Sequence, residues 1–336
     1  MLNGGGDCAG LNAVTRGVLA AAMGYGDEVI GVRNGWAGLL SKDVEPISYS
    51  RFEDAIGEGG TLLGTSRTNP MKRQDGLETV MHNLKETGAD ALIAVGGDDT
   101  LGVALELHRR GTKVVGVPKT IDNDLAGTDF SFGFFSAVDE AMRLLESLKT
   151  TGRSHGRVMV AEVMGRDAGW ITLYAGTAAG CDLIIIPEFP MKLEEIVEFV
   201  RQREKKGKRS TMIAVAEGVK LVSRNVQKDE FGHELVAKAV GESNASYLAR
   251  VIEEGTGLET RATVLGHTIR GSRANAYDRV MTSMLGIRAV EAVHGGRFGI
   301  MLSIRGAGIS EVPLDEGVKK KFVDMQTWET LRKFFI

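Results

Sequence analysis

Residues 94–104 read AVGGDDTLGVA, and residues 114–125 read VVGVPKTIDNDL. In both stretches a short apolar run ends abruptly in a turn that is rich in aspartate and in glycine or proline. Such runs are typical of buried parallel strands, and ligands bind beyond the carboxyl ends of the strands in such sheets. We therefore expect one crevice to collect a set of charged side chains, namely Asp98, Asp99, Lys119, Asp122 and Asp124. Carboxylates beside an ammonium predict a metal, a polyphosphate and a proton transfer.

Composition and charge fit an α/β protein. Of the 336 residues 43% are hydrophobic, enough for one or two packed cores, and the 44 glycines fit many tight turns between strands and helices. A net charge of -3 argues against general binding to nucleic acid or membranes. The basic residues of 205–209 are expected at a solvated helix end. Two cysteines, Cys8 and Cys181, are too few for a disulfide framework, and with no apparent signal peptide or membrane span they predict a cytoplasmic protein.

Strand patterns alternate with helical patterns along the chain. Helices are expected over 139–149 and 276–293, and a third near residue 193 has an apolar face at positions i, i+3, i+4 and i+7. The charged segment 221–243 is expected to be a surface excursion. This alternation is the signature of doubly wound α/β sheets. The predicted strands cover 28–32, 91–95, 113–117, 157–163, 183–186, 212–216 and 297–302.

Two glycine-rich motifs precede predicted helices. The first, NGGGDCAGLN over 3–12, can offer backbone N–H groups and a helix dipole to a phosphate, although a plain structural turn has the same composition. The second, GGDDT over 96–100, contains Asp98, which can hold Mg²⁺ or cap the helix that follows. Similar Gly-Gly-Asp-x-Thr motifs occur in lipid and NAD kinases. Neither motif alone therefore defines the substrate.

The motif PKTIDND over 118–124 combines a lysine with two acids at a strand end. Asp and Asn in turns often satisfy their own backbone, so a purely structural role is one interpretation. The chemical interpretation is that a carboxylate accepts a hydroxyl proton while a phosphoryl group moves to that oxygen. A fixed cation then neutralises the charge that develops on the phosphoryl group.

Arginines further along the chain suggest capture of a phosphorylated molecule. Arg157 begins a predicted strand and Arg166 follows its end, so the two lie at opposite poles and one of them can serve a neighbouring subunit. Each arginine alone is also compatible with a surface ion pair. Together with Glu217 and His267 they favour a ligand that is both phosphorylated and rich in hydroxyl groups.

The order and spacing of these motifs, and of others between them, resemble the 6-phosphofructokinase family over nearly the whole chain. That resemblance implies two similar doubly wound α/β lobes with the active site in the cleft between them. Residues 1–133 and 269–307 would form the larger, donor-binding lobe, and residues 134–268 and 308–336 the smaller, sugar-phosphate-binding lobe. The matching stretches are GGGDCAGLNA, LLGTSR, GGDDT, PKTIDND, GTDFSFGFFSAV, SHGRVMVAEVMGRDAGW, IPE, ETRATVLGHTIRG and AYDR.

The resemblance also implies roles for individual residues. Asp122 is the expected base for the sugar 1-hydroxyl, and Asp98 is the expected Mg²⁺ site. The other expected catalytic residues are Arg166, Lys119, Asp99, Thr120 and Asp124. The expected donor-binding residues are Gly6, Arg67, Gly97, Asp98, Asp99 and Thr100. The expected sugar-phosphate contacts are Thr120, Ile121, Asp122, Met164, Gly165, Arg166, Glu217, His267 and Arg270, with Arg157 and Arg261 reaching in from an adjacent subunit of a homodimer or homotetramer.

Asp99 and Lys119 bear on the phosphoryl donor. ATP-dependent members usually carry glycine at the place of Asp99, whereas this chain resembles the pyrophosphate-dependent branch at both positions. A carboxylate at Asp99 adds bulk and like charge where the α-phosphate of a nucleotide must lie. The expected reaction is Mg²⁺-dependent, reversible phosphoryl transfer from pyrophosphate to fructose 6-phosphate. An ATP-dependent 6-phosphofructokinase and a truncated or regulatory sugar-phosphate-binding subunit remain alternatives.

One departure from the family pattern concerns the first strand. Family members carry a full strand ahead of the first glycines, whereas only residues 1–3 precede them here. We therefore expect this central strand to be missing and its neighbours to lack backbone partners.

Overall fold

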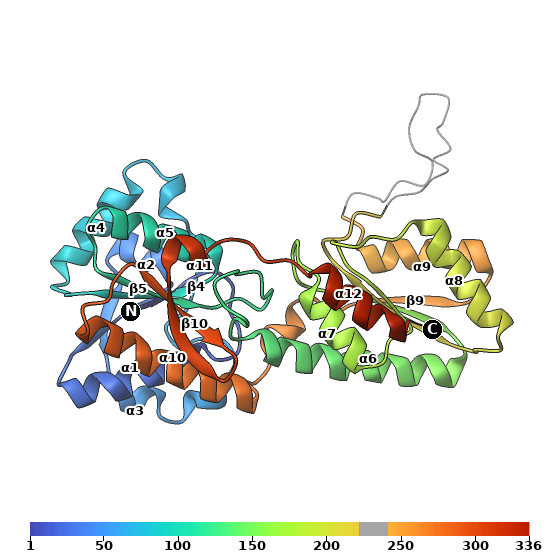
Figure 1. The fold of residues 1–336 in the computed structure, drawn as a ribbon, viewed down its shortest axis with the longest axis horizontal. Helices are drawn as coiled ribbons and strands as arrows, with labels where there is room; N and C mark the ends of the chain where they lie inside the picture. Colours follow the sequence, from blue (N-terminus) through green and yellow to red (C-terminus); the bar gives the residue numbers. More distant parts are fainter. Residues whose placement is uncertain (222–240, 336) are drawn as a thin grey trace. The chain divides into compact units, whose positions relative to one another are not determined.

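The computed structural model describes residues 1–221 and 241–335 (Figure 1). Its contacts divide the chain into two compact units. Unit 1 consists of Met1–Ala137 and Arg270–Lys321, and unit 2 of Val138–Ile269 and Phe322–Ile336. The expected surface excursion over 221–243 lies almost wholly outside the described residues. Within the described part, each helix is too short or too polar to cross a membrane.

A seven-stranded sheet with the order β11-β10-β5-β4-β1-β2-β3 forms the centre of unit 1. Its five inner strands are parallel, as the apolar runs predict, and β3 and β11 pair antiparallel at the two edges. The sequence pattern misses both edge strands because half-exposed, polar strands lack a continuous apolar run. The bounds are β1 Leu2–Asn3, β2 Val29–Val32, β3 Val44–Ile47, β4 Leu92–Gly96, β5 Val114–Pro118, β10 Ile300–Arg305 and β11 Gly308–Pro313.

Helices cover both faces of this sheet (Figure 1). On one face α1 and α10 pack so closely that a Cβ atom at Gly17 would lie 2.3 Å from the carbonyl oxygen of Ser283. On the other face α2, α4 and α5 bury a core that includes Leu2, Trp36 and Val103. The helices of this unit are α1 Leu11–Tyr25, α2 Trp36–Ser41, α3 Tyr49–Phe52, η1 Ala55–Gly57, η2 Pro70–Lys72, α4 Gly76–Glu86, α5 Asp98–Arg109, α10 Ala276–His294 and α11 Leu314–Gly317.

Unit 2 contains a parallel four-stranded sheet with the order β7-β8-β6-β9. Its strands are β6 Val158–Val163, β7 Leu183–Ile185, β8 Thr211–Ala216 and β9 Thr260–Val264, the last of which the sequence pattern misses because its side chains are mostly exposed. The predicted apolar face of α8 is confirmed, since it packs into the core formed with α9. The helices are α6 Phe134–His155, which begins in unit 1, α7 Trp170–Ala178, α8 Leu193–Lys205, α9 Asn244–Thr256, η3 Gly266–Ile269, α12 Met325–Leu331 and η4 Arg332–Phe334.

The structure corrects two expectations. The central strand is present, because Leu2 pairs with Val32 of β2 and with Ala94 of β4. The family resemblance also implies that residues 308–321 belong to the smaller lobe, but these residues belong to unit 1. The reason is that β11 pairs with β10 along its whole length, so the chain stays with the first sheet before it enters unit 2.

Candidate functional site

The glycine-rich turn after β1 lies against two buried cations. Lys119 is 4% exposed, and its ammonium donates a hydrogen bond to the carbonyl oxygen of Gly6. Arg270 is 6% exposed, and its Nη1 donates to the carbonyl oxygen of Asp7 at 3.3 Å. A Cβ atom at Gly6 would lie only 2.7 Å from Arg270 Nη1, so glycine is what allows the guanidinium to approach. Burial lowers the pKa of Lys119, and the positive charge of Arg270 lowers it further.

A neighbouring loop brings Arg67 to this turn. The N–H of Gly5 donates to the carbonyl oxygen of Ser66 at 2.9 Å, and Thr65 Oγ1 donates to the carbonyl oxygen of Gly5 at 2.8 Å. The exposed Arg67 directly follows this contact. Two predicted donor-binding residues, Gly6 and Arg67, and the predicted catalytic residue Lys119 therefore lie on neighbouring segments of unit 1.

Asp98 and Asp99 are the first two residues of α5, and the helix cap is Gly97. The alternative that Asp98 acts as the helix cap is therefore wrong. Asp98 is partly buried, whereas Asp99 is exposed, and both carboxylates lie at the positive end of the helix dipole. The side chain of Thr100, in contrast, is 2% exposed and fills space that Gly4 and Gly96 leave. The carboxylates of Asp98 and Asp99 are therefore accessible to a ligand, whereas the buried side chain of Thr100 packs against the two glycines.

The loop after β5 holds Asp122 at a buried position, 4% exposed. The N–H of Asp122 donates to Thr120 Oγ1 at 3.1 Å, and Ser131 Oγ donates to the carbonyl oxygen of Thr120 at 2.6 Å. Asn123 has a φ of 51°, and its Oδ1 accepts from the N–H of Ser131 at 3.1 Å. Thr120 and Asn123 therefore stabilise the loop, while Ile121 is buried beside Asp122.

Lys320 is a residue of this site that the sequence reasoning misses. Its Nζ lies 2.7 Å from Asp98 Oδ2 and 2.5 Å from Asp124 Oδ2. Burial lowers the pKa of Lys320, but the hydrogen bonds to Asp124 and Asp98 outweigh it and raise the pKa above its ordinary value. The lysine run over 319–321 could have indicated a basic contact, but the sequence does not show which acidic side chains these lysines reach.

Backbone pairing holds this lysine run beside the loop after β5. The N–H of Lys321 donates to the carbonyl oxygen of Asp124 at 2.9 Å, and the N–H of Ala126 donates to that of Lys319 at 2.8 Å. The ammonium of Lys321 donates to Asn123 Oδ1 at 3.1 Å and to the carbonyl oxygens of the loop. Burial lowers the pKa of Lys321 to about 8.

In unit 2, Glu217 holds the turn that follows β6. Its Oε1 accepts the N–H groups of Gly165 at 3.2 Å and of Arg166 at 2.8 Å. Arg166 has a φ of 50°, a left-handed conformation that is uncommon for a residue with a side chain. Met164 is buried just before this turn. The carboxyl ends of β6 and β8 therefore bring together four of the predicted sugar-phosphate residues.

Arg157 and Arg261 meet at one carboxylate. Arg157 Nε lies 2.8 Å from Glu259 Oε2, and Arg261 pairs with Oε1 of the same residue. The pairing of β6 with β9 puts Arg157 at the opposite end of β6 from Arg166, as the sequence predicts. His267 is exposed in η3, which follows the carboxyl end of β9.

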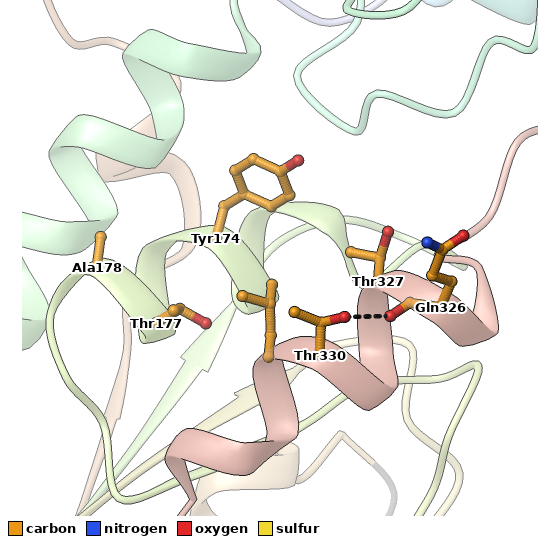
Figure 2. A pocket seen from close by; sticks show the side chains of 7 residues that line it. Tyr174, Thr177, Ala178, Gln326, Thr327 and Thr330 are labelled. Atoms are coloured by element: carbon orange, nitrogen blue, oxygen red, sulfur yellow. Dashed lines mark hydrogen bonds between the residues drawn. The ribbon is translucent and has the colours of Figure 1, made fainter.

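A cavity of about 480 Å³ lies apart from the predicted site residues, between α7 and α12 of unit 2. Figure 2 shows Tyr174 and Thr177 on one side and Gln326, Thr327 and Thr330 on the other. The Thr330 hydroxyl donates to the carbonyl oxygen of Gln326 at 2.8 Å. Burial raises the pKa of Tyr174. The cavity is thus lined by neutral side chains rather than by the cations and carboxylates described above.

The chain is similar to known phosphofructokinases from end to end. The family pattern described as "Phosphofructokinase" matches residues 1–293. Pyrophosphate--fructose 6-phosphate 1-phosphotransferases of Dictyoglomus thermophilum and Amycolatopsis methanolica are 44% and 47% identical, over 100% of this chain and 97% and 98% of theirs. ATP-dependent 6-phosphofructokinase 3 of Streptomyces coelicolor is 44% identical, over 95% of this chain and 94% of its own.

The fold agrees with these similarities. The crystal structure of Pichia pastoris phosphofructokinase in the T-state superimposes with a TM-score of 0.83 and 29% identity. The match covers 99% of this chain and 36% of that longer chain. On the sequence match and the shared α/β fold together, this chain belongs to the phosphofructokinase family.

Proposed function

We propose that this chain is a phosphotransferase that moves a phosphoryl group from pyrophosphate to the 1-hydroxyl of fructose 6-phosphate. The products are fructose 1,6-bisphosphate and phosphate, and the reaction runs in both directions. Two relatives with this activity in their names are 44% and 47% identical over the whole chain, which supports the assignment. An ATP-dependent relative at 44% identity makes ATP the second candidate donor.

The pair of buried cations at the glycine-rich turn is the observation that carries this proposal. Lys119 and Arg270 both contact the backbone of residues 6–7, and their like charges oppose each other in a buried place. A small polyanion would relieve that repulsion and bind strongly to two poorly hydrated cations. The exposed Arg67 lies at the edge of the same turn and adds a third positive charge.

Asp99 supports pyrophosphate rather than ATP as the donor. It is the second residue of α5, beside the predicted metal residue Asp98, and its carboxylate is exposed to any ligand that approaches this helix end. A nucleotide must pass its α-phosphate through this region, where bulk and like charge oppose it. Pyrophosphate has no such extension and avoids that repulsion.

In the proposed mechanism Asp122 accepts the proton of the sugar 1-hydroxyl as that oxygen attacks the phosphoryl group. The bond between the transferred phosphorus and the bridging oxygen of pyrophosphate breaks, and phosphate leaves. Thr120 and Ile121 hold the loop that presents Asp122, and Asp124 lies on its other side. Lys119 and Arg166 are proposed to neutralise the charge that develops on the transferred group.

The residues present fit a magnesium ion at Asp98. Asp98 and Asp124 already direct two carboxylate oxygens at a single cation, the ammonium of Lys320. Magnesium prefers one or two carboxylates together with substrate phosphates. Among the described residues, His, Cys, Asp and Glu side chains do not gather in groups of three that could hold a metal without a substrate. Bound Mg²⁺ would neutralise charge on the donor phosphates, with Asp98 and Asp124 as its protein ligands.

The sugar phosphate is proposed to bind the residues gathered in unit 2. The turn of Met164, Gly165 and Arg166, held by Glu217, would contact the sugar, and His267 would bind the phosphate or a hydroxyl. Arg157 and Arg261 are proposed to serve the site of an adjacent subunit in a homodimer or homotetramer. Their shared partner Glu259 keeps both guanidinium groups in one place, which supports a joint role.

One assay tests the proposal. Purified protein with Mg²⁺ and fructose 6-phosphate is given pyrophosphate or ATP in parallel, and fructose 1,6-bisphosphate is measured. We expect a higher kcat/KM with pyrophosphate. A preference for ATP would overturn the donor assignment, and failure to use either donor would favour a regulatory sugar-phosphate-binding subunit. A cytoplasmic location stays a prediction that rests on the sparse use of cysteine.

A further inference from the structure

The contact between Lys320 and two carboxylates joins three separate segments of unit 1. Asp98 begins α5, Asp124 belongs to the loop after β5, and Lys320 comes from the chain that follows α11. One ammonium lies 2.7 Å from Asp98 Oδ2 and 2.5 Å from Asp124 Oδ2. A cation at this point compensates charges that would otherwise repel each other, with Asp99 adding a further carboxylate at the same helix end.

Backbone pairing holds the main chain of Lys320 in place, but its side chain can adopt another conformation. Lys320 pairs with Leu125 in an antiparallel bridge, flanked by the hydrogen bonds of Lys321 and Lys319 to the loop. Its side chain is 41% exposed, in contrast to the 4% exposure of Lys119. A lysine on a flexible four-carbon stem can therefore move its ammonium into solvent without disturbing the backbone that carries it.

Lys320 and a divalent cation would therefore compete for the same position. The ammonium and the metal seek the same two carboxylates, and their positive charges repel each other at short range. We propose that Lys320 is a built-in counter-ion of the Asp98–Asp124 pair that a divalent cation displaces, so that Lys320 lowers the affinity of the chain for the free metal ion. The metal then binds well only when it arrives with a phosphorylated ligand, whose negative charge favours both cations. This inference rests on the proposed function, since it takes Asp98 as the metal-binding residue.

The test measures Mn²⁺ binding to the full chain without any substrate, from the loss of the electron paramagnetic resonance signal of free Mn²⁺. Lys320→Met keeps most of the side-chain stem and removes the charge, and it should bind Mn²⁺ about tenfold more tightly, within the usual range of coupling between two ligands. Lys320→Arg keeps the charge and should bind as the wild type does. Lys319→Met is the matched control, because this adjacent lysine is exposed and its loss changes the net charge equally.

Thermal unfolding supplies a second readout. Without metal, Lys320→Met should melt below the wild type, because two carboxylates lose their counter-ion. Mn²⁺ should then raise its melting temperature more than that of the wild type, since tighter binding to the folded state stabilises it more. If Lys320→Met does not fold, Lys320→Gln replaces it in both measurements.

The outcomes separate this inference from the proposed function. Asp98→Asn should lose Mn²⁺ binding in the background of Lys320→Met. If that binding persists, the metal assignment of Asp98 is wrong, and the inference is wrong with it. If Asp98→Asn abolishes binding but Lys320→Met binds Mn²⁺ no more tightly than the wild type, the inference alone is overturned. Equal tightening by Lys319→Met would also overturn it, because the effect would then be one of net charge.

Discussion

A methyl group at Gly6 should disturb both stability and substrate binding. In Gly6→Ala the new Cβ atom would lie 2.7 Å from Nη1 and 3.3 Å from Cζ of Arg270. Ordinary contact between such atoms needs about 3.5 Å, so the guanidinium must retreat by roughly 0.8 Å. Arg270 is 6% exposed and has little room to move. Its hydrogen bond to the carbonyl oxygen of Asp7 is already 3.3 Å long, so the retreat breaks it.

The structure sets the size of the expected effect. Overpacking of a buried place costs about 1–3 kcal/mol, and a lost hydrogen bond from a charged group costs a similar amount. Because a retreat that breaks the hydrogen bond also relieves the overpacking, the two costs are alternatives and do not add. We therefore expect the free energy of unfolding to fall by about 1–3 kcal/mol, which lowers the melting temperature by about 2–12 °C. Because Arg270 is also a predicted sugar-phosphate contact, KM for fructose 6-phosphate should rise in parallel.

Gly102→Ala is the matched control, because it adds the same methyl group inside α5, where no atom other than those of the adjacent residues and the helix's own backbone lies within 4 Å. Alanine is favoured over glycine in a helix by about 0.5–1 kcal/mol, so this variant should melt at or above the temperature of the wild type with unchanged KM. Calorimetry and steady-state kinetics measure both quantities. A Gly6→Ala protein with wild-type melting temperature and KM would refute the close contact between Gly6 and Arg270.

Four other predictions concern the base, the donor, the assembly and pH. Asp122→Asn should lower kcat by at least about 100-fold with a smaller change in sugar binding, and near-normal turnover in the folded variant would rule out Asp122 as the base. Asp99→Gly should raise kcat/KM for ATP by about 30- to 1000-fold, which corresponds to relief of about 2–4 kcal/mol of repulsion; no gain would contradict the role of Asp99. Mixing inactive Asp122→Asn with inactive Arg261→Ala should regenerate activity after subunit exchange, whereas a fully active monomer would refute shared sites. Burial lowers the pKa of Lys321 from its ordinary 10.5 to about 8, so the folded state releases this proton at a lower pH than the unfolded state does. The stability of the wild type relative to Lys321→Met should therefore rise from pH 8 to pH 10.5. Melting temperatures of both proteins at the two ends of this range check the sign.

Much of the fold could be predicted from local patterns. The inner strands β4 and β5 are apolar runs that end in turns, and burial on both faces of a parallel sheet demands such runs. The edge strands β3, β9 and β11 could not be predicted, because a strand with one exposed face or edge needs no apolar run. Each of these strands forms because a neighbouring strand supplies its hydrogen-bonding partners, and the local sequence does not show which strand that is.

The same distinction between local pattern and tertiary packing applies to the residues of the candidate site. Local sequence predicts that Asp98, Lys119 and Asp122 follow strands of one sheet, because the order of strands and turns along the chain is a local property. Tertiary packing, in contrast, brings Lys320 to Asp124, 196 positions away, and Arg270 to Asp7, 263 positions away. Charge and spacing along a chain do not encode which distant carboxylates or carbonyls an ammonium or guanidinium will reach. Those contacts follow from how the strands and the chain segments between them pack.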